Sequence, residues 1–382
     1  MADKNYTIVL SETSLDKIIS FKNDLLSEKL VAGAYLKKSL DTFSKQGVSL
    51  EQMSNEQFID LLLSTKLPKV FGSSIKCDGT DWTRTELLVL GDVNIAMPVE
   101  IYDNGVWVLS DGHFRTHDPP LQGELLFTPG PLLRGKKMKL PPDLEEISTG
   151  ASIDQNKYNS MIDRRMTPLL YHANDKAKKE KVSALITIPG VGCGVFAGKY
   201  KGQMGERLNK ALQYIVTNHA IHWTHISCIY YDPFEECKNE QVVVHSVNYR
   251  VRPRKYNPDR SQLMDPKQYQ EPGDDFSKCK LFKIVAWDHV SFPGNNFFEK
   301  NSRRTDDGVS AAATNSMEVI TGVKGNYVRG KYLPPRGKTE WKQVVQENQI
   351  TLRAKGNVNI ATKEGSYVDL SEFECREPPR KK

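Results

Sequence analysis

Apolar positions in residues 1–65 recur at helical spacing. Leu15, Ile18 and Ile19 form one set, and Phe58, Leu61 and Leu62 form another. Steps of three and four residues place side chains on one face of an α-helix. The pattern therefore predicts an N-terminal helical region over residues 1–65.

From residue 66 onward the pattern changes to short β-rich runs separated by turn residues. The run TELLVLGDVNIAMPVEIYDNGVWVLSDG contains Asp-Asn-Gly at 103–105, which predicts a β-hairpin turn at that point. A Pro- and Gly-rich stretch over 127–146 is typical of a long loop. The next segment, 152–180, has the pattern of a helix followed by a charged connection.

Two strand–loop–helix units follow. In the first, VSALITIP predicts a buried strand, GVGCGVFAG a glycine loop, GERLNKALQYIVTNH an amphipathic helix and THISCIYYD a second strand. In the second, a strand over 279–288 precedes a polar loop and a helix over 307–322. Such units place strands in parallel, so we expect an α/β fold with a mixed sheet.

Composition argues against several classes of protein and kinds of site. The 382 residues are 38% hydrophobic, and no run approaches the ~20 apolar residues needed to span a bilayer. Six scattered cysteines without a CxxC pair argue against a disulfide scaffold and a zinc site, and favour a reducing cytosol. The net charge of +6 fits either an anion-binding face or solvated basic loops. Neither a membrane nor a nucleic acid is an expected partner.

The glycine loop has the features of a phosphate site. Gly190, Gly192, Gly194 and Gly198 allow backbone N–H groups to approach a ligand, and the following helix offers its positive end. The spacing matches neither a Walker loop nor the full dinucleotide fingerprint. Glycine-rich turns also serve tight packing, and this alternative stays open.

The second loop carries the polar groups. Asp288 ends a strand, Asn295 and Asn296 follow a Pro-Gly turn, and Asp306 and Asp307 begin a helix. One aspartate before an alanine-rich helix is an ordinary N-cap. The whole set facing a phosphate loop favours a functional site, because capping needs only one of them.

The two loops together resemble those of macrodomains, which are ADP-ribose-binding α/β/α folds. GVGCGVFAG is similar to their diphosphate loop and to the GCGAFGG type of poly(ADP-ribose) glycohydrolases, and WDHVSFPGNNFFEKNSRRTDDGVSAAATNSM resembles the other ligand loop. Their reversed order along the chain narrows the resemblance to an atypical, arginine-specific group found among Legionella effectors. It implies an α/β/α core over 66–325, an N-terminal helical extension over 1–65 and a C-terminal extension over 326–382.

This resemblance also implies a function: hydrolysis of ADP-ribose from arginine of a protein, with ubiquitin as the substrate and with neither metal nor cofactor. The expected location is the host cytosol, after secretion, or the cytoplasm. The implied catalytic positions are Asp288, Asn296, Asp306 and Asp307. The implied ADP-ribose-binding positions are Gly190, Val191, Gly192, Cys193, Gly194, Val195, Phe196, Ala197 and Asn295.

Position 296 departs from the expected pattern, since the group is expected to carry Asp there. Asn has nearly the same shape but is neither a base nor an anion. The chain is then a weak or inactive hydrolase, or a reader that holds ADP-ribose uncleaved. A third hypothesis is a ubiquitin or nucleic-acid interaction protein in which both loops are structural and no ADP-ribose binds.

Overall fold

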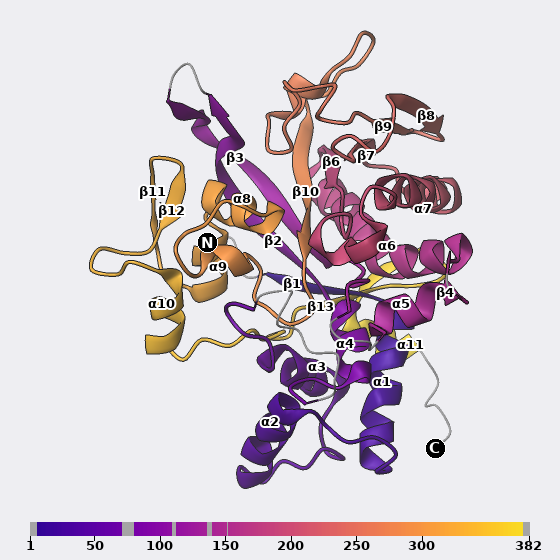
Figure 1. Ribbon diagram of the computed structural model, residues 1–382, viewed down its shortest axis with the longest axis vertical. Coiled ribbons are helices and arrows are strands. Elements are labelled where there is room, and N and C mark those ends of the chain that lie inside the picture. Colours follow the sequence, from indigo (N-terminus) through magenta and orange to yellow (C-terminus); the bar gives the residue numbers. More distant parts are fainter. Residues whose placement is uncertain (1–5, 71–79, 109–111, 136–139, 151, 377–382) are drawn as a thin grey trace.

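A ten-stranded mixed sheet organises the computed structural model, which describes residues 6–70, 80–108, 112–135, 140–150 and 152–376 (Figure 1). The strand order is β14-β13-β1-β2-β3-β10-β6-β7-β9-β8. The strands are β1 (Thr7–Ser11), β2 (Asn94–Val108), β3 (His113–Pro129), β6 (Ser183–Pro189), β7 (Ile226–Asp232), β8 (Glu240–Val244), β9 (Val247–Val251), β10 (Cys279–Trp287), β13 (Val358–Ala361) and β14 (Tyr367–Asp369). Two small hairpins lie outside it: β4 (Ser148–Thr149) with β5 (Ser152–Ile153), and β11 (Asn326–Val328) with β12 (Lys331–Leu333).

Most strands of the sheet run in one direction. β13 is parallel to β1, and β3, β10, β6, β7 and β9 are parallel neighbours. Because β2 is antiparallel to both β1 and β3, these two groups share the same direction. The carboxyl ends of β3, β10 and β6 therefore meet at one edge of the sheet.

Helices cover both faces of the sheet, as the alternation of apolar side chains requires. On β10, Phe282 and Ile284 point to one hydrophobic core, and Leu281 and Val285 point to the other. The first core is covered by α5 (Pro142–Ile147), α6 (Gln155–Glu180) and α7 (Met204–His219). The second is covered by α1 (Glu12–Leu26), α2 (Ala34–Lys45), α3 (Asn55–Ser64), α4 (Arg84–Gly91), α8 (Asp306–Ala313), α9 (Ser316–Thr321), α10 (Trp341–Glu347) and α11 (Leu370–Arg376). This confirms the α/β/α layering with a mixed sheet.

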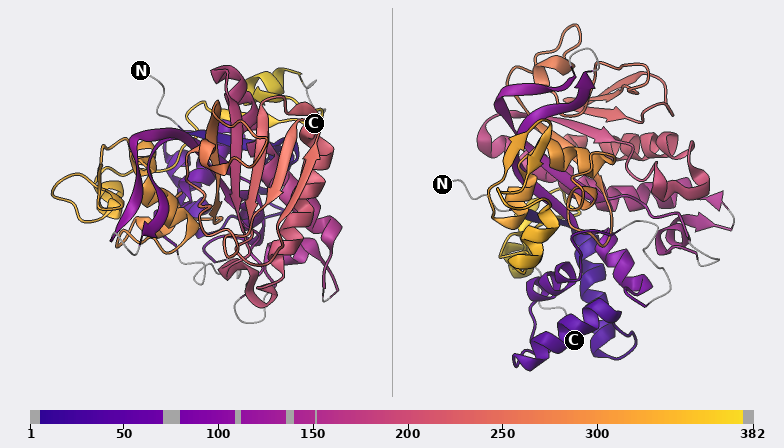
Figure 2. Two further views of the ribbon diagram at one scale, coloured as in Figure 1. Left: turned by 90° about the horizontal axis from the view of Figure 1, so that it is seen from above. Right: turned by 60° about the vertical axis from the view of Figure 1, so that its left-hand side comes forward.

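The N-terminal helices gather at one end of the molecule, below the sheet in Figure 1 and in the right-hand view of Figure 2. Three of them begin at side-chain caps: Ser11 for α1, Ser54 for α3 and Thr83 for α4. Within the described residues, no helix combines the length and the apolar character needed to cross a bilayer.

Strands from both predicted extensions belong to the main sheet. β1 lies within residues 1–65, which the periodicity had marked as helical, and β13 and β14 lie within 326–382. The run TIVLS has only five residues, so it does not stand out as a strand beside the helical pattern that follows it. It is buried between β2 and β13.

The Asp-Asn-Gly sequence at 103–105 does not form the predicted hairpin turn. β2 continues through it to Val108, with register shifts on both sides of Asp103. The Asp103 and Asn104 side chains accept hydrogen bonds from the N–H groups of Gly105 and Val106. These local bonds produce a bulge in the strand, because they replace ladder bonds without reversing the chain.

The helix predicted over 307–322 is two helices, α8 and α9. Thr314 is extended between them, with φ −134° and ψ 167°. Its hydroxyl donates to Ser310 O, and the side-chain oxygen of Asn315 accepts from the N–H of Glu100 on β2. Side-chain bonds of this kind compete with the helical ladder, so the alanine-rich helix ends early.

Candidate functional site

A cavity of about 470 Å³ opens at the carboxyl ends of β3, β10 and β6. This is where open α/β sheets bind ligands, and the volume is in the range of small-molecule sites. The glycine loop follows β6, and the polar loop follows β10. The cavity is lined by Val70, Arg134, Gly190, Gly192, Gly194, Val195, Phe196, Ala286, Trp287, Asp288, Asn295, Asn296, Thr305, Asp306 and Asp307.

Two glycines of the first loop serve close packing. Gly192 has φ +75°, and a Cβ there would lie 2.7 Å from Cδ of Pro131. Gly198 has φ +56°, and its Cβ would lie 3.2 Å from Cα of Arg134. The loop is thus pressed against the segment that follows β3, and the packing interpretation of glycine is correct for these two positions.

The centre of the loop offers free donors. A Cβ on Gly194 would meet nothing within 4 Å. Among the described residues, none accepts a hydrogen bond from the N–H of Gly194, Val195 or Phe196, all of which line the cavity. Unpaired backbone N–H groups facing a cavity are suited to phosphate oxygens.

Three expected binding positions do not line the cavity. Val191, Cys193 and Ala197 are buried in the core under α6 and α7. Their N–H groups already donate within the loop, to Pro189 O, Gly190 O and Gly194 O respectively. Burial also raises the pKa of the Cys193 thiol well above its ordinary range, which argues against a nucleophilic role.

Asp288 holds the start of the polar loop. One carboxylate oxygen accepts from the N–H groups of Val290 and Ser291, at 2.8 and 2.7 Å. The other accepts from the Ser291 hydroxyl and, at 3.1 Å, from the Asn295 amide. Four donors satisfy this buried carboxylate, so its structural role is to fix the conformation of the first residues of the polar loop.

Asn295 connects this loop to the N-terminal region. Its amide accepts from the N–H of Val70 and donates to the carbonyl of the same residue. Leu67 pairs with the loop in the same way, from its N–H to Val290 O at 2.9 Å and from Phe292 N–H to its carbonyl at 2.8 Å. Residues 66–70 therefore form a strap along the polar loop, and Val70 forms part of the cavity wall.

Lys66 fixes the other end of this strap. Its Nζ donates to His289 O at 2.5 Å and lies 4.1 Å from the ring centroid of Trp287. Burial lowers the pKa of Lys66 to about 7, and the charge of Asp288 opposes that shift.

Asp306 is held by an ion pair. One of its oxygens lies 2.7 Å from Nζ of Lys283, a buried side chain on β10, and the other accepts from the N–H of Ala286 at 2.9 Å. Both oxygens are thus committed to β10, and the ion pair anchors the first residue of α8 to the sheet.

Asp307 differs from the other two aspartates. Its Oδ1 accepts from the Thr305 hydroxyl at 2.5 Å and from the N–H of Gly308 at 2.9 Å, and no described residue donates to its Oδ2. Burial, and then the charges of Asp288 and Asp306, raise the pKa of Asp307 to about 7. A carboxyl group with such a pKa exchanges protons near neutral pH.

Asn296 is connected to Asp307 through the hydroxyl group of Thr305. Its Nδ2 donates to the Thr305 hydroxyl at 2.9 Å, and Thr305 donates onward to Asp307. Thr305 is also the N-cap of α8. The sequence did not single out Thr305, although a threonine before two aspartates is a recognisable capping signal.

A buried ionic network connects segments that adjoin the cavity. Arg165 on α6 makes two bonds to Asp143, at 2.7 and 3.0 Å, and one of 3.0 Å to Asp92. Asp143 also accepts from the N–H of Leu132, and its Oδ2 lies 3.0 Å from Nε2 of His289. The network connects the segment after β3 to the residue following Asp288, and so ties the two cavity walls together.

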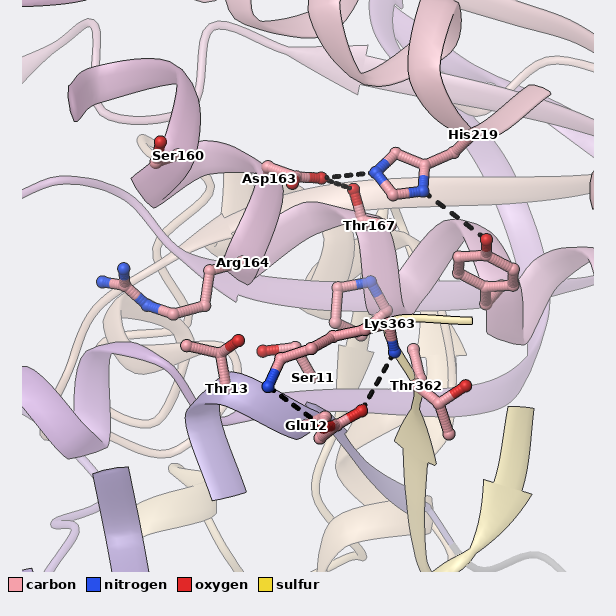
Figure 3. Close-up of a pocket in the computed structure, with 13 residues that line it drawn as sticks. Ser11, Glu12, Thr13, Ser160, Asp163, Arg164, Thr167, His219, Thr362 and Lys363 are labelled. Atoms are coloured by element: carbon pink, nitrogen blue, oxygen red, sulfur yellow. Dashed lines mark hydrogen bonds and ion pairs between the residues drawn. The ribbon is translucent and has the colours of Figure 1, made fainter. Parts of the chain in front are cut away.

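A second cavity, of about 270 Å³, lies at the carboxyl ends of β1 and β13. In Figure 3, Asp163, Thr167 and His219 point toward one another, and so do Glu12 and Lys363. His219 pairs with Asp163 at 3.0 Å, Thr167 donates to Asp163, and Lys363 pairs with Glu12 at 3.0 Å. These groups satisfy each other, and the loops singled out by the sequence lie elsewhere, so the first cavity is the better candidate.

Several residues that line the cavity were not predicted from the sequence. Val70 and Arg134 belong to segments far from both loops in the chain, and only the fold brings them to the cavity. Ala286 and Trp287 end β10 just before Asp288, within the segment 279–288 that was predicted only as a strand. No local sequence signal marks Val70 or Arg134.

Comparison with known proteins agrees with this geometry. Among curated proteins, none matches the sequence. The family model described as macrodomain effector MavL matches residues 6–338, a range that contains β1, the strap and both loops. The chain belongs to the MavL family of macrodomain effectors.

Proposed function

We propose that the cavity binds ADP-ribose and that the chain hydrolyses the bond between ADP-ribose and an arginine side chain of a protein. Membership of a macrodomain family supports ADP-ribose as the ligand. The unpaired N–H groups of Gly194, Val195 and Phe196 suit the diphosphate. The carboxyl groups of the polar loop line the same cavity, which supports a position of the distal ribose and the arginine beside them.

The chemistry requires a group that moves a proton. As the bond from the anomeric carbon to the guanidinium nitrogen breaks, its electron pair leaves with the nitrogen, and the ribose acquires oxocarbenium character. Water attacks that carbon, loses a proton to a carboxylate and forms the new C–O bond. The carboxyl group then passes the proton to the departing guanidine, which leaves as the guanidinium ion.

The observation that carries the proposal is the state of Asp307. Its Oδ2 lacks a donor among the described residues, its pKa of about 7 allows both proton acceptance and donation, and it lines the cavity. Asp288, whose carboxylate is held by its four donors, supplies negative charge that stabilises the cationic transition state, and the Asp306–Lys283 ion pair fixes the start of α8 beside it.

Release of ADP-ribose from an ADP-ribosyl-arginine peptide tests the proposal. The unmodified chain should release it, and Asp307→Asn should slow the release by at least ~100-fold while ADP-ribose still binds. Calorimetry with free ADP-ribose measures the binding separately. Equal rates for the two proteins would contradict the role of Asp307, and absence of binding would contradict the ligand.

A reader of ADP-ribosylated proteins is the second candidate, and Asn296 is the observation in its favour. The amide of Asn296 donates to Thr305, where an aspartate would compete with Asp307 for the Thr305 hydroxyl. A chain that binds ADP-ribose, cleaves nothing and gains activity through Asn296→Asp would be a reader. Cleavage by the unmodified chain would exclude this candidate.

Ubiquitin and the host cytosol are the substrate and the location that the family resemblance favours. The test compares ubiquitin ADP-ribosylated on arginine with an unrelated protein modified in the same way. Preference for ubiquitin by more than ~10-fold in kcat/KM supports it as the substrate, since that ratio exceeds what one surface contact supplies. Equal rates would indicate that the enzyme reads only ADP-ribosyl-arginine.

A further inference from the structure

Charge is distributed unevenly along the cavity. Asp288, Asp306 and Asp307 line the end under the polar loop. Among the described residues that line the cavity, Arg134 is the only one with a basic side chain, and it belongs to the wall built by the segment after β3. A ligand carrying two phosphate charges must enter a cavity whose other ionisable groups are all acidic.

Arg134 is positioned by the glycine loop itself. The N–H of the preceding residue, Leu133, donates to Phe196 O at 2.9 Å. Gly198 approaches the Arg134 backbone so closely that a Cβ on this glycine would lie 3.2 Å from Cα and from Cβ of Arg134. The backbone of Arg134 is therefore held beside the glycine loop, in which the N–H groups of Gly194, Val195 and Phe196 have no acceptor among the described residues.

Backbone N–H donors alone do not offset the negative charge of the carboxyl groups that line the cavity. An N–H group supplies a partial charge, while the Asp288 carboxylate and the ionised fraction of Asp307 repel a diphosphate, Asp306 being paired with Lys283. A guanidinium supplies a full charge and donors whose geometry matches two phosphate oxygens. It also sets orientation, because the diphosphate is drawn toward Arg134 and the distal ribose is left beside the aspartates.

We propose that the Arg134 guanidinium is the counter-charge of the ligand's diphosphate and orients ADP-ribose in the cavity. This inference rests on the function proposed above. Arg134 acts as a binding residue at a distance from the reacting bond, so its loss should weaken ligand binding more than it changes the proton transfer at Asp307.

Lys199 provides a matched control. It lies in the same loop region, and it lines a neighbouring cavity of about 340 Å³ together with Arg134, but it does not line the cavity of about 470 Å³. Both side chains are exposed and both carry one positive charge. A difference between their substitutions therefore reports a contact, whereas equal effects report only the net charge of the region.

The experiment is calorimetric titration of ADP-ribose into the full chain and into Arg134→Met, Arg134→Lys and Lys199→Met, at about 50 mM and about 500 mM NaCl. Arg134→Met should weaken binding roughly tenfold at low salt, with a smaller difference at high salt. Arg134→Lys should recover part of the loss, and Lys199→Met should stay within about twofold of the unmodified chain. Thermal unfolding checks that the exposed substitutions leave the fold intact.

Two results would overturn the inference while leaving the ADP-ribose site in place. One is binding by Arg134→Met that equals binding by the unmodified chain. The other is equal weakening by Arg134→Met and Lys199→Met. If the unmodified chain fails to bind ADP-ribose, the proposed function falls and this inference falls with it.

Discussion

Thr305 stands between Asn296 and Asp307, accepting a hydrogen bond from the first at 2.9 Å and donating one to the second at 2.5 Å. A hydroxyl has one proton to donate, so the amide of Asn296 directs that proton toward Asp307. The residue at 296 therefore influences the protonation of Asp307 through the Thr305 hydroxyl. A carboxylate at 296 would compete for the same proton and would add a negative charge nearby.

Replacing Thr305 should shift the pH dependence of hydrolysis. The Thr305 hydroxyl lowers the pKa of Asp307, against the larger effect of burial, so Thr305→Val should raise that pKa above about 7. The midpoint of kcat/KM against pH should move upward by roughly one unit, and Thr305→Ser should restore it. Identical profiles for the valine variant and the unmodified chain would show that the hydroxyl only caps α8, whose loss costs about 1 kcal/mol of stability.

Asp307→Asn should stabilise the protein at high pH. The pKa of Asp307 is raised in the folded state, from 3.8 to about 7, so the folded state binds the proton more tightly than the unfolded state. Stability therefore falls as pH rises from about 4 to about 7, by up to roughly 4 kcal/mol. Urea unfolding should show that Asp307→Asn gains stability at about pH 8 and gains little at about pH 4. Equal gains at both pH values would contradict a raised pKa.

The buried ionic network should be far more important to stability than a surface ion pair. Arg165→Met would leave Asp143 and Asp92 buried without their shared counter-charge, at a cost of about 3–5 kcal/mol. Arg84→Met removes the exposed pair with Glu145 and should cost less than about 1 kcal/mol. Denaturant unfolding measures both. Similar losses of stability for the two variants would mean that the buried network stabilises the fold no more than a surface ion pair does.

Gly192→Ala should damage the site more than Gly202→Ala. Both glycines have positive φ, of +75° and +87°, so alanine is strained at each by about 1 kcal/mol. Only at Gly192 does the new methyl group also meet Pro131, at 2.7 Å, whereas nothing lies within 4 Å of Gly202. Gly192→Ala should lose additional stability and bind ADP-ribose more weakly. Equal stability losses would show that the loop moves away from Pro131 without resistance.

Local patterns predicted the parts of the fold that depend on local interactions. The strands β6, β7 and β10 and the helix α7 begin and end within about two residues of their predicted positions, because buried runs and amphipathic periodicity are properties of short segments. The bulge at Asp103 and the break at Thr314 were missed. In both places a side chain bonds to the nearby backbone, which apolar periodicity does not register.

The candidate site was predictable as two loops but not as a cavity. Strand–loop–helix order indicated that both loops lie at the carboxyl edge, and the structure brings Gly194 and Asp307 to one cavity. The sequence alone did not show how Asp288, Asp306 and Asp307 differ in role. Their difference lies in the partners Lys283, Ser291 and Thr305, and in burial, which are properties of the folded chain.

The position of β10 has a consequence for how the protein is made. This strand lies between β3 and β6, although it begins at Cys279, long after β3 has ended at Pro129 and β6 at Pro189. During synthesis the edges of β3 and β6 remain unpaired with each other until β10 emerges and inserts between them. A nascent chain that stops before β10 therefore exposes two open strand edges and lacks a ligand cavity, so its need for protection from aggregation is greatest late in translation.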